Sequence, residues 1–227
     1  MPSQRPVSAF DIIGPIMVGP SSSHTAGAVR LGLIGRSILG ATPETALIEL
    51  HGSFAQTGKG HGTDRALVAG LLGFAPDDPR IRYSFDIAAE TGLRFQIAEV
   101  DLGGDAHPNS VRLTLRAGER EMVLVGASIG GGMIEITDIQ GYGVHFTGEH
   151  DALIVVAEDR PGTINAVTGV LLERHINVAF SRVERKQRGG EAIMIFETDD
   201  AIPSALLEAI EDFHWVRWAR HVSKVTG

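Results

Sequence analysis

The stretch that decides the fold of the C-terminal part is DALIVVAEDRPGTINAVTGVLLERHINVAF, residues 151–180. Near its start, Leu153–Val156 is an uninterrupted aliphatic run, which is typical of a buried strand. Segment 161–172 opens with a proline, a residue favoured in the first turn of a helix, and carries apolar residues at helical spacing. Segment 176–180 then alternates between apolar and polar or small residues, which predicts a second strand.

The sequence beyond this stretch continues the alternation of strands and helices. Arg188–Gly190 predicts a hairpin turn, and Ala192–Phe196 predicts the next strand. Pro203 opens a second helix with apolar residues at helical spacing, and residues 215–222 close the unit as a strand. This order of elements, βαββαβ, is that of a ferredoxin-like unit, which we expect to occupy residues 151–227.

The N-terminal part, residues 1–148, is rich in glycine and broken by polar loops. It predicts a separate α+β domain, so the whole chain is expected to have an α+β fold. In its first helix, Ala28, Gly32 and Gly35 would let another backbone approach closely, at some cost in helix propensity. The predicted helices are 25–39 and 64–72, and the predicted strands are 47–50, 94–100, 111–115, 122–125 and 134–138.

Composition narrows the class of protein. The 227 residues carry a net charge of −8 and include no cysteine. The acidic balance argues against nonspecific nucleic-acid binding. The lack of thiols excludes disulfides, cysteine nucleophiles and an iron–sulfur cluster held by this chain's own thiolates. No apolar run approaches the roughly 20 residues of a membrane span, and the N-terminus lacks a signal-peptide core, so we expect a cytoplasmic protein.

Residues 19–28, GPSSSHTAGA, gather five polar side chains between a Gly-Pro pair and a run of small residues. One interpretation is a helix N-cap at Ser22 or Ser23, because a serine there accepts the free amide hydrogens of the first turn. The other is an anion site, in which the hydroxyls and His24 join the positive end of the helix around a carboxylate or phosphate. One cap needs only one hydroxyl, and the sequence leaves both interpretations open.

Residues 51–64, HGSFAQTGKGHGTD, have the wrong glycine spacing for a phosphate-binding loop or a dinucleotide fingerprint. We expect a flexible loop that holds Lys59, His61 and Asp64. Asp64 could simply cap the following helix. His61 stands between glycines, where nothing beside it packs, which favours a functional role over a solvated one.

Two shorter segments complete the set of polar motifs. HPNS, residues 107–110, predicts a turn that leads into a strand. ASIGGG, residues 127–132, predicts a bulge or a strand break, or alternatively a backbone that approaches a ligand. The histidines lack short zinc-ligand spacing and no serine-hydrolase elbow is present, so we expect no metal site in this chain.

In this order, the four motifs resemble the beta domain of bacterial iron–sulfur L-serine dehydratases. Residues 151–224 resemble an ACT domain, a small regulatory module that usually binds amino acids and pairs with a second copy. The first domain also resembles, in fold, the intervening (allosteric substrate-binding) domain of some phosphoglycerate dehydrogenases, which an ACT domain again follows. The alternative to an enzyme subunit is therefore a non-catalytic, amino-acid-sensing module.

The resemblance implies the beta chain of a two-chain enzyme that converts L-serine to pyruvate and ammonia. The catalytic [4Fe–4S] cluster of this family is held by cysteines of the alpha part. Because this chain has neither cysteines nor an alpha part, the resemblance implies a separate alpha chain, without which the beta chain is inactive. It also implies homodimerisation through the ACT domain.

The resemblance further places the two polar loops at the active site between the two parts. His61 becomes the acid/base candidate, with Lys59 near the substrate carboxylate and His24 in support. The implied substrate-binding residues are Ser21, Ser22, Ser23, Thr25, Asp64 and Asn109. In the ACT domain the residues implied for a regulatory ligand such as serine, or else for dimer contacts alone, are Asp159, Arg160, Pro161, Gly162, Thr163 and Asn177.

Overall fold

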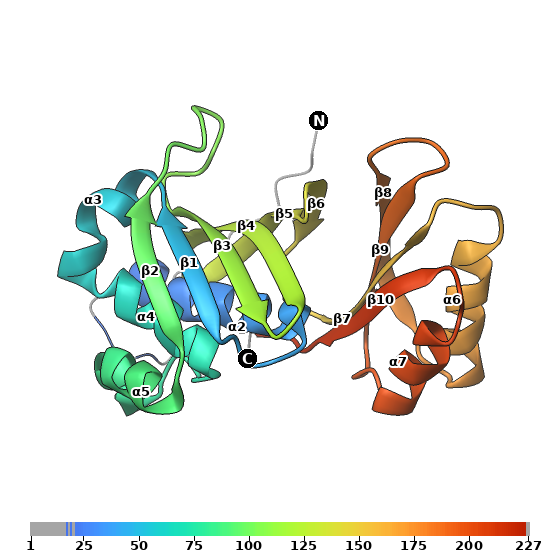
Figure 1. Ribbon diagram of the computed structural model, residues 1–227, viewed down its shortest axis with the longest axis horizontal. Coiled ribbons are helices and arrows are strands. Elements are labelled where there is room, and N and C mark those ends of the chain that lie inside the picture. Colours follow the sequence, from blue (N-terminus) through green and yellow to red (C-terminus); the bar gives the residue numbers. More distant parts are fainter. Residues whose placement is uncertain (1–16, 18, 20, 226–227) are drawn as a thin grey trace.

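The computed structural model describes residues 17, 19 and 21–225 of the chain. Two β-sheets lie side by side, each with helices on one of its faces (Figure 1). The first sheet has six strands in the order β2-β1-β3-β4-β5-β6, and the second has four in the order β10-β7-β9-β8. The α+β fold expected from the sequence is confirmed.

In the first sheet only β1 and β2 are parallel, and every other neighbouring pair is antiparallel. A parallel pair needs a long crossover, and here the crossover contains three helices and a 3₁₀ turn. The strands are β1 (Thr45–Leu50), β2 (Arg94–Glu99), β3 (Ser110–Ala117), β4 (Arg120–Gly130), β5 (Met133–Ile139) and β6 (Tyr142–Phe146).

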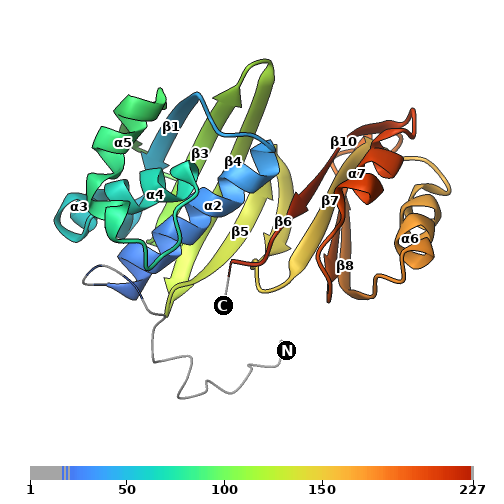
Figure 2. The same cartoon turned by 90° about the horizontal axis from the view of Figure 1, so that it is seen from below.

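The helices of this part cover one face of the first sheet (Figure 2). The central helix crosses its neighbour at two glycines: a Cβ on Gly32 would lie 2.5 Å from the Leu67 carbonyl oxygen, and one on Gly70 only 2.1 Å from that of Val29. The predicted close approach of a second backbone is confirmed at Gly32, whereas Gly35 packs against leucine side chains of the sheet. The elements are η1 (Ser22–Gly27), α2 (Ala28–Leu39), α3 (Gly52–His61), α4 (Thr63–Leu72), η2 (Pro79–Tyr83) and α5 (Ser84–Thr91).

The second sheet and its two helices form the predicted ferredoxin-like unit. Its first helix begins later than expected: Pro161 precedes it, and Gly162, in the left-handed conformation at φ 94°, is its N-cap. The elements are β7 (Asp151–Glu158), α6 (Thr163–Glu173), β8 (Val178–Arg185), β9 (Glu191–Thr198), α7 (Ser204–Glu211) and β10 (Val216–Val222).

Both faces of the second sheet are covered, which explains the uninterrupted apolar run in β7. Leu153 and Val155 face the core beneath α6 and α7. Ile154 and Val156 face the other way and join the core of the first domain, as does Ile195 of β9. One face of the second sheet therefore shares the core of the first domain, while the other face packs in a core of its own. The predicted division at residues 148 and 151 stays a prediction.

The prediction of a flexible loop over residues 51–64 is wrong, because most of this segment forms α3. Phe54 is fully buried in the core and anchors the helix. Gly62 ends it in the left-handed conformation, at φ 72°, and only Gly52 among the other glycines needs a positive φ. Helix α5 and strand β6 were not predicted at all, whereas each predicted strand has a counterpart.

Candidate active site at the start of helix α2

The segment SSHTAG forms a single π-helical turn, η1, that runs directly into α2. Its N-cap is Ser21, whose Oγ accepts a hydrogen bond from the His24 amide at 3.3 Å. The predicted cap at Ser22 or Ser23 is therefore wrong by one or two residues. Turns of this kind occur often at functional sites. Gly27 lets the turn lie against β4, since a Cβ there would be 2.1 Å from the Oγ of Ser128.

His24 is held on both ring nitrogens. Its Nε2 lies 3.0 Å from Thr57 Oγ1, and its Nδ1 lies 3.3 Å from Ser21 Oγ. The Thr57 hydroxyl donates its one proton to the Ser53 carbonyl at 2.8 Å, so its oxygen accepts from His24 Nε2–H. That leaves Nδ1 free to accept the proton of the Ser21 hydroxyl. The contacts thus fit a neutral imidazole that orients the serine.

Helix α3 brings His61 beside His24. The two rings lie 4.8 Å apart between centroids, and Phe54 contacts the His24 ring edge to face at 5.3 Å. Burial lowers the pKa of His24, and the neighbouring His61 lowers it further. His61 itself is exposed at the end of the helix. The site therefore pairs one fixed, neutral imidazole with one that faces outward.

The HPNS and ASIGGG segments meet beside this turn. Ser128 donates its amide hydrogen to the Asn109 carbonyl at 3.0 Å, and Asn109 Nδ2 donates to the Ser128 carbonyl at 3.4 Å. Among the described residues, Thr25 Oγ1, Asn109 Oδ1 and Ser128 Oγ are buried without a hydrogen-bond partner. Unsatisfied buried polar atoms are uncommon and need an explanation, such as an ion, water or ligand.

The remaining predicted residues of this domain lie in three successive helical elements, η1, α3 and α4. Ser22 and Ser23 lie half-buried within η1. Asp64 lies in the first turn of α4 and accepts the amide hydrogen of Arg65 at 2.8 Å, while the N-cap is Gly62. Lys59 belongs to α3, and its side chain lies outside what the structure describes.

Sequence reasoning missed Thr57, the residue that fixes the ring of His24. Thr57 stands four residues before His61 on α3, so the two share a helix face. Ser128 was missed as well, although it lies inside the ASIGGG segment that had been singled out. Ser128 could have been found from its place in the ASIGGG segment. Thr57 could have been found only if residues 52–61 had been recognised as a helix, whereas their glycines indicated a loop.

The predicted regulatory residues cluster at the start of α6. The Asp159 carboxylate accepts from the Gly189 amide and from Arg185 Nη1, both at 3.0 Å, and these bonds lower its pKa. Arg160 Nη1 lies 3.4 Å from His214 Nε2, and Thr163 donates its hydroxyl hydrogen to the Arg160 carbonyl. Pro161 and Gly162 form the turn between them. Asn177 instead donates to Asp199 at 2.7 Å, beyond the far end of the helix.

Comparison with known proteins identifies the family of each part of the chain. Residues 8–138 match the profile of the serine dehydratase beta chain. The chain therefore belongs to the serine dehydratase beta chain family. Residues 152–214 match the ACT domain, in agreement with the ferredoxin-like topology of the second sheet.

Two L-serine dehydratase beta chains are similar to this chain along most of its length. A probable L-serine dehydratase beta chain of Bacillus subtilis is 44% identical over 203 residues, which cover 89% of this chain and 92% of the relative. An L-serine dehydratase beta chain of Peptoniphilus asaccharolyticus is 41% identical over 205 residues, with the same coverage. A D-3-phosphoglycerate dehydrogenase of Methanocaldococcus jannaschii is 31% identical over 51% of this chain and 22% of its own, which favours the dehydratase interpretation over the sensor.

The residues of this beta chain do not fit an iron–sulfur cluster. The sequence has no cysteine to supply thiolate ligands. Within the described residues, no group of three or more histidine, cysteine, aspartate or glutamate side chains is placed to hold a metal ion.

No helix of the described part of the chain is long and apolar enough to span a bilayer.

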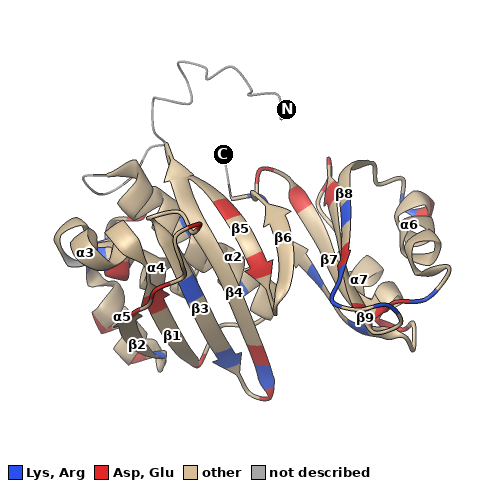
Figure 3. Cartoon of the chain, turned by 90° about the horizontal axis from the view of Figure 1, so that it is seen from above, with Lys and Arg blue, Asp and Glu red and all other residues tan. Residues whose placement is uncertain are grey.

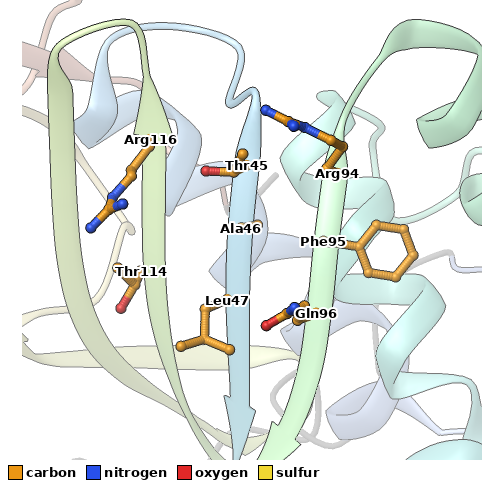
Figure 4. Close-up of a pocket in the computed structure, with 8 residues that line it drawn as sticks. All are labelled: Thr45, Ala46, Leu47, Arg94, Phe95, Gln96, Thr114 and Arg116. Carbon is orange, nitrogen blue, oxygen red and sulfur yellow. The ribbon is translucent and has the colours of Figure 1, made fainter.

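A broad hollow of about 500 Å³ lies on the open face of the first sheet, away from η1 (Figure 4). In register across β2, β1 and β3, Arg94 and Arg116 flank Thr45. The Arg116 guanidinium is already paired with Glu121 of β4 at 2.5 Å. None of the residues predicted from the sequence lines this hollow, so it carries no assigned role.

Proposed function

We propose that this chain works as the beta chain of an L-serine dehydratase and that η1 binds the carboxylate of L-serine. The observation that carries the proposal is the meeting of four polar segments, separated along the chain, around one π-helical turn with orphaned hydroxyl and amide groups. With its alpha chain it would deaminate L-serine to pyruvate and ammonia.

Carboxylate binding follows from the free groups of the turn. The first amide hydrogens of a helix have no partner within the helix and carry the positive end of its dipole. In η1 these amides belong to Ser22 and Ser23, next to the hydroxyl of Ser21 that His24 orients. Thr25 Oγ1 of the turn and Asn109 Oδ1 are buried without a hydrogen-bond partner among the described residues, and we propose them as further contacts. Lys59 and Asp64 are proposed as further contacts from α3 and α4.

Proton transfer is assigned to His61. Removal of a proton from the α-carbon needs a base that can reach the substrate. Both ring nitrogens of His24 are engaged, whereas His61 is exposed beside it. We therefore propose that His61 accepts the α-carbon proton of the substrate. We propose that His24 positions the turn and, as a neutral imidazole, adds no positive charge beside His61.

Any [4Fe–4S] cluster of the assembled enzyme must take its thiolate ligands from the alpha chain. A cluster iron would act as a Lewis acid toward the leaving hydroxyl. The beta chain's part is to bind the substrate, orient it and move a proton. A chain without cysteines also suits a reducing compartment, and we keep the cytoplasm as the proposed location.

We further propose that the ACT domain dimerises along β8. This strand lies at the edge of its sheet, and Val183 on it is an exposed apolar residue, at 42% exposure. An uncovered edge strand is a template for pairing with another chain. The turn from Asp159 to Thr163, with Asn177, is proposed as the site of a regulatory ligand such as serine.

The function is tested by anaerobic co-expression of this chain with a cysteine-containing alpha chain, followed by assay of pyruvate from L-serine. We expect activity only in the assembled enzyme. Ser21→Ala should raise KM for L-serine by about tenfold, because it removes the hydroxyl that lies beside the free amides of Ser22 and Ser23. Full activity of the beta chain by itself, without iron, would rule the proposal out.

A further inference from the structure

A cleft of about 360 Å³ lies where the two sheets meet, far along the chain from η1. One wall comes from β6 and the connection after it, and the other from β8 and β9. The residues that line it are His145, Thr147, Glu149, His150, Phe180, Ser181, Arg182 and Glu197.

Two opposite charges face this cleft without forming an ion pair. Glu197 is half-buried, and among the described residues its carboxylate has no hydrogen-bond or ion-pair partner. Arg182 lies close enough for its charge to act on Glu197, yet it too is unpaired within the described part of the chain. Burial raises the pKa of Glu197 and the neighbouring charge of Glu149 adds to that shift, whereas the charges of His150, His145 and Arg182 oppose it.

The other residues that line the cleft suit a small organic molecule bound between Glu197 and Arg182. The rings of Phe180 and His150 lie 5.5 Å apart between centroids and form an apolar side. Thr147 and Ser181 offer hydroxyls. His145 is paired with Glu135, and two carboxylates, those of Glu149 and Glu197, line the cleft. Charged residues of both signs lie along β8 (Figure 3).

We propose that this cleft binds a small α-amino acid as its zwitterion, with the ammonium at Glu197 and the carboxylate at Arg182. A guanidinium is the preferred partner of a carboxylate, and a half-buried carboxylate gains most from a cation held within contact distance. Such a ligand would span the gap that keeps Glu197 and Arg182 from pairing directly. The site is separate from η1 and from the turn at Asp159–Thr163, so it does not rest on the proposed function.

Occupancy of the cleft would tie the two domains together. Thr147, Glu149 and His150 belong to β6's continuation, while Arg182 and Glu197 belong to the second sheet. A ligand held by both walls stabilises their contact by mass action. The cleft therefore offers a route by which an amino acid alters the packing of the second domain on the first.

The test is calorimetric titration of the full beta chain, without an alpha chain, with L-alanine and L-serine. We expect Arg182→Gln and Glu197→Gln each to weaken binding at one site per chain by tenfold or more. The matched controls are Arg174→Gln and Glu208→Gln, which change exposed residues on α6's end and α7 and should leave binding unaltered. Lactate, which lacks the ammonium, and ethanolamine, which lacks the carboxylate, should not bind there.

Two outcomes would overturn the proposal. One is the absence of binding by either amino acid at millimolar concentration in the wild-type chain. The other is binding that Arg160→Gln abolishes while Arg182→Gln and Glu197→Gln leave it intact, which would place the ligand at the turn before α6. Loss of pyruvate formation in the assembled enzyme bears on η1 and not on this titration, so the two proposals fail separately.

Discussion

The turn around His24 and the end of α3 around His61 lie in contact but are built in opposite ways. His24 has both ring nitrogens bonded and Phe54 against its edge, and Gly27 next to it packs directly on β4. His61 is exposed, and a Cβ on neighbouring Gly60 or Gly62 would meet nothing within 4 Å. The first half of the site is complete within this chain, whereas the second has room for another chain to close it.

The largest expected effect separates the two histidines by kinetics. In the assembled enzyme, His61→Ala should lower kcat by about 10²–10⁴-fold, the usual contribution of an acid/base group. His24→Ala should act mainly on KM for L-serine, because it frees Ser21 and the turn rather than removing the proton acceptor. Steady-state pyruvate formation across a range of L-serine concentrations measures both.

Near-normal turnover in His61→Ala, combined with a lost kcat in His24→Ala, would reverse the assignment. The pH profile adds a readout that a structural role would not move: the limb of kcat/KM due to the base should disappear with His61 and persist with His24 replaced.

The next effect compares two glycines by stability. Gly27→Ala would push a methyl group to within 2.1 Å of Ser128 Oγ, and such overpacking costs about 1–3 kcal/mol. Gly60→Ala meets open space inside a helix, so it should be neutral or stabilise by up to about 1 kcal/mol. Urea unfolding of the beta chain measures both, and equal destabilisation by the two changes would contradict the contrast.

The smallest expected effect is on how the stability of the folded chain depends on pH, and it comes from His24. Because its pKa is lowered in the folded chain, the unfolded chain binds the proton more tightly, and stability falls as the pH drops below about 6.5. His24→Gln should reduce the acid-induced fall of Tm between pH 7.5 and 5.5 by about 1–2 °C. His214→Gln, on the second domain, is the chemically matched control, and an identical fall in wild type and His24→Gln would refute the expectation.

Periodicity predicted the second domain almost completely, because its strands and helices are regular and each has a buried face. Leu153–Val156 stood out since both faces of β7 are covered. The close helix crossing at Gly32 could also be predicted, because a residue without a Cβ leaves room for another backbone to approach the helix.

Helix α3 could not be predicted, because its glycines oppose helix formation and its stability comes from distant contacts. Phe54 is buried against residues far away in the sequence, and Thr57 bonds to His24, 33 residues earlier. The same holds for the partnership of Asn109 and Ser128, which only the antiparallel register of β3 and β4 brings together.

The shared core has a consequence for how such a chain can be cut or recombined. Ile154, Val156 and Ile195 are covered by the first domain, so a second domain transplanted onto another protein would carry a bare apolar face with it. Transfer of this ACT domain to another enzyme would require an apolar surface on the new partner that covers these three side chains. The packing of the ACT domain against the first domain is therefore part of what keeps these side chains out of water.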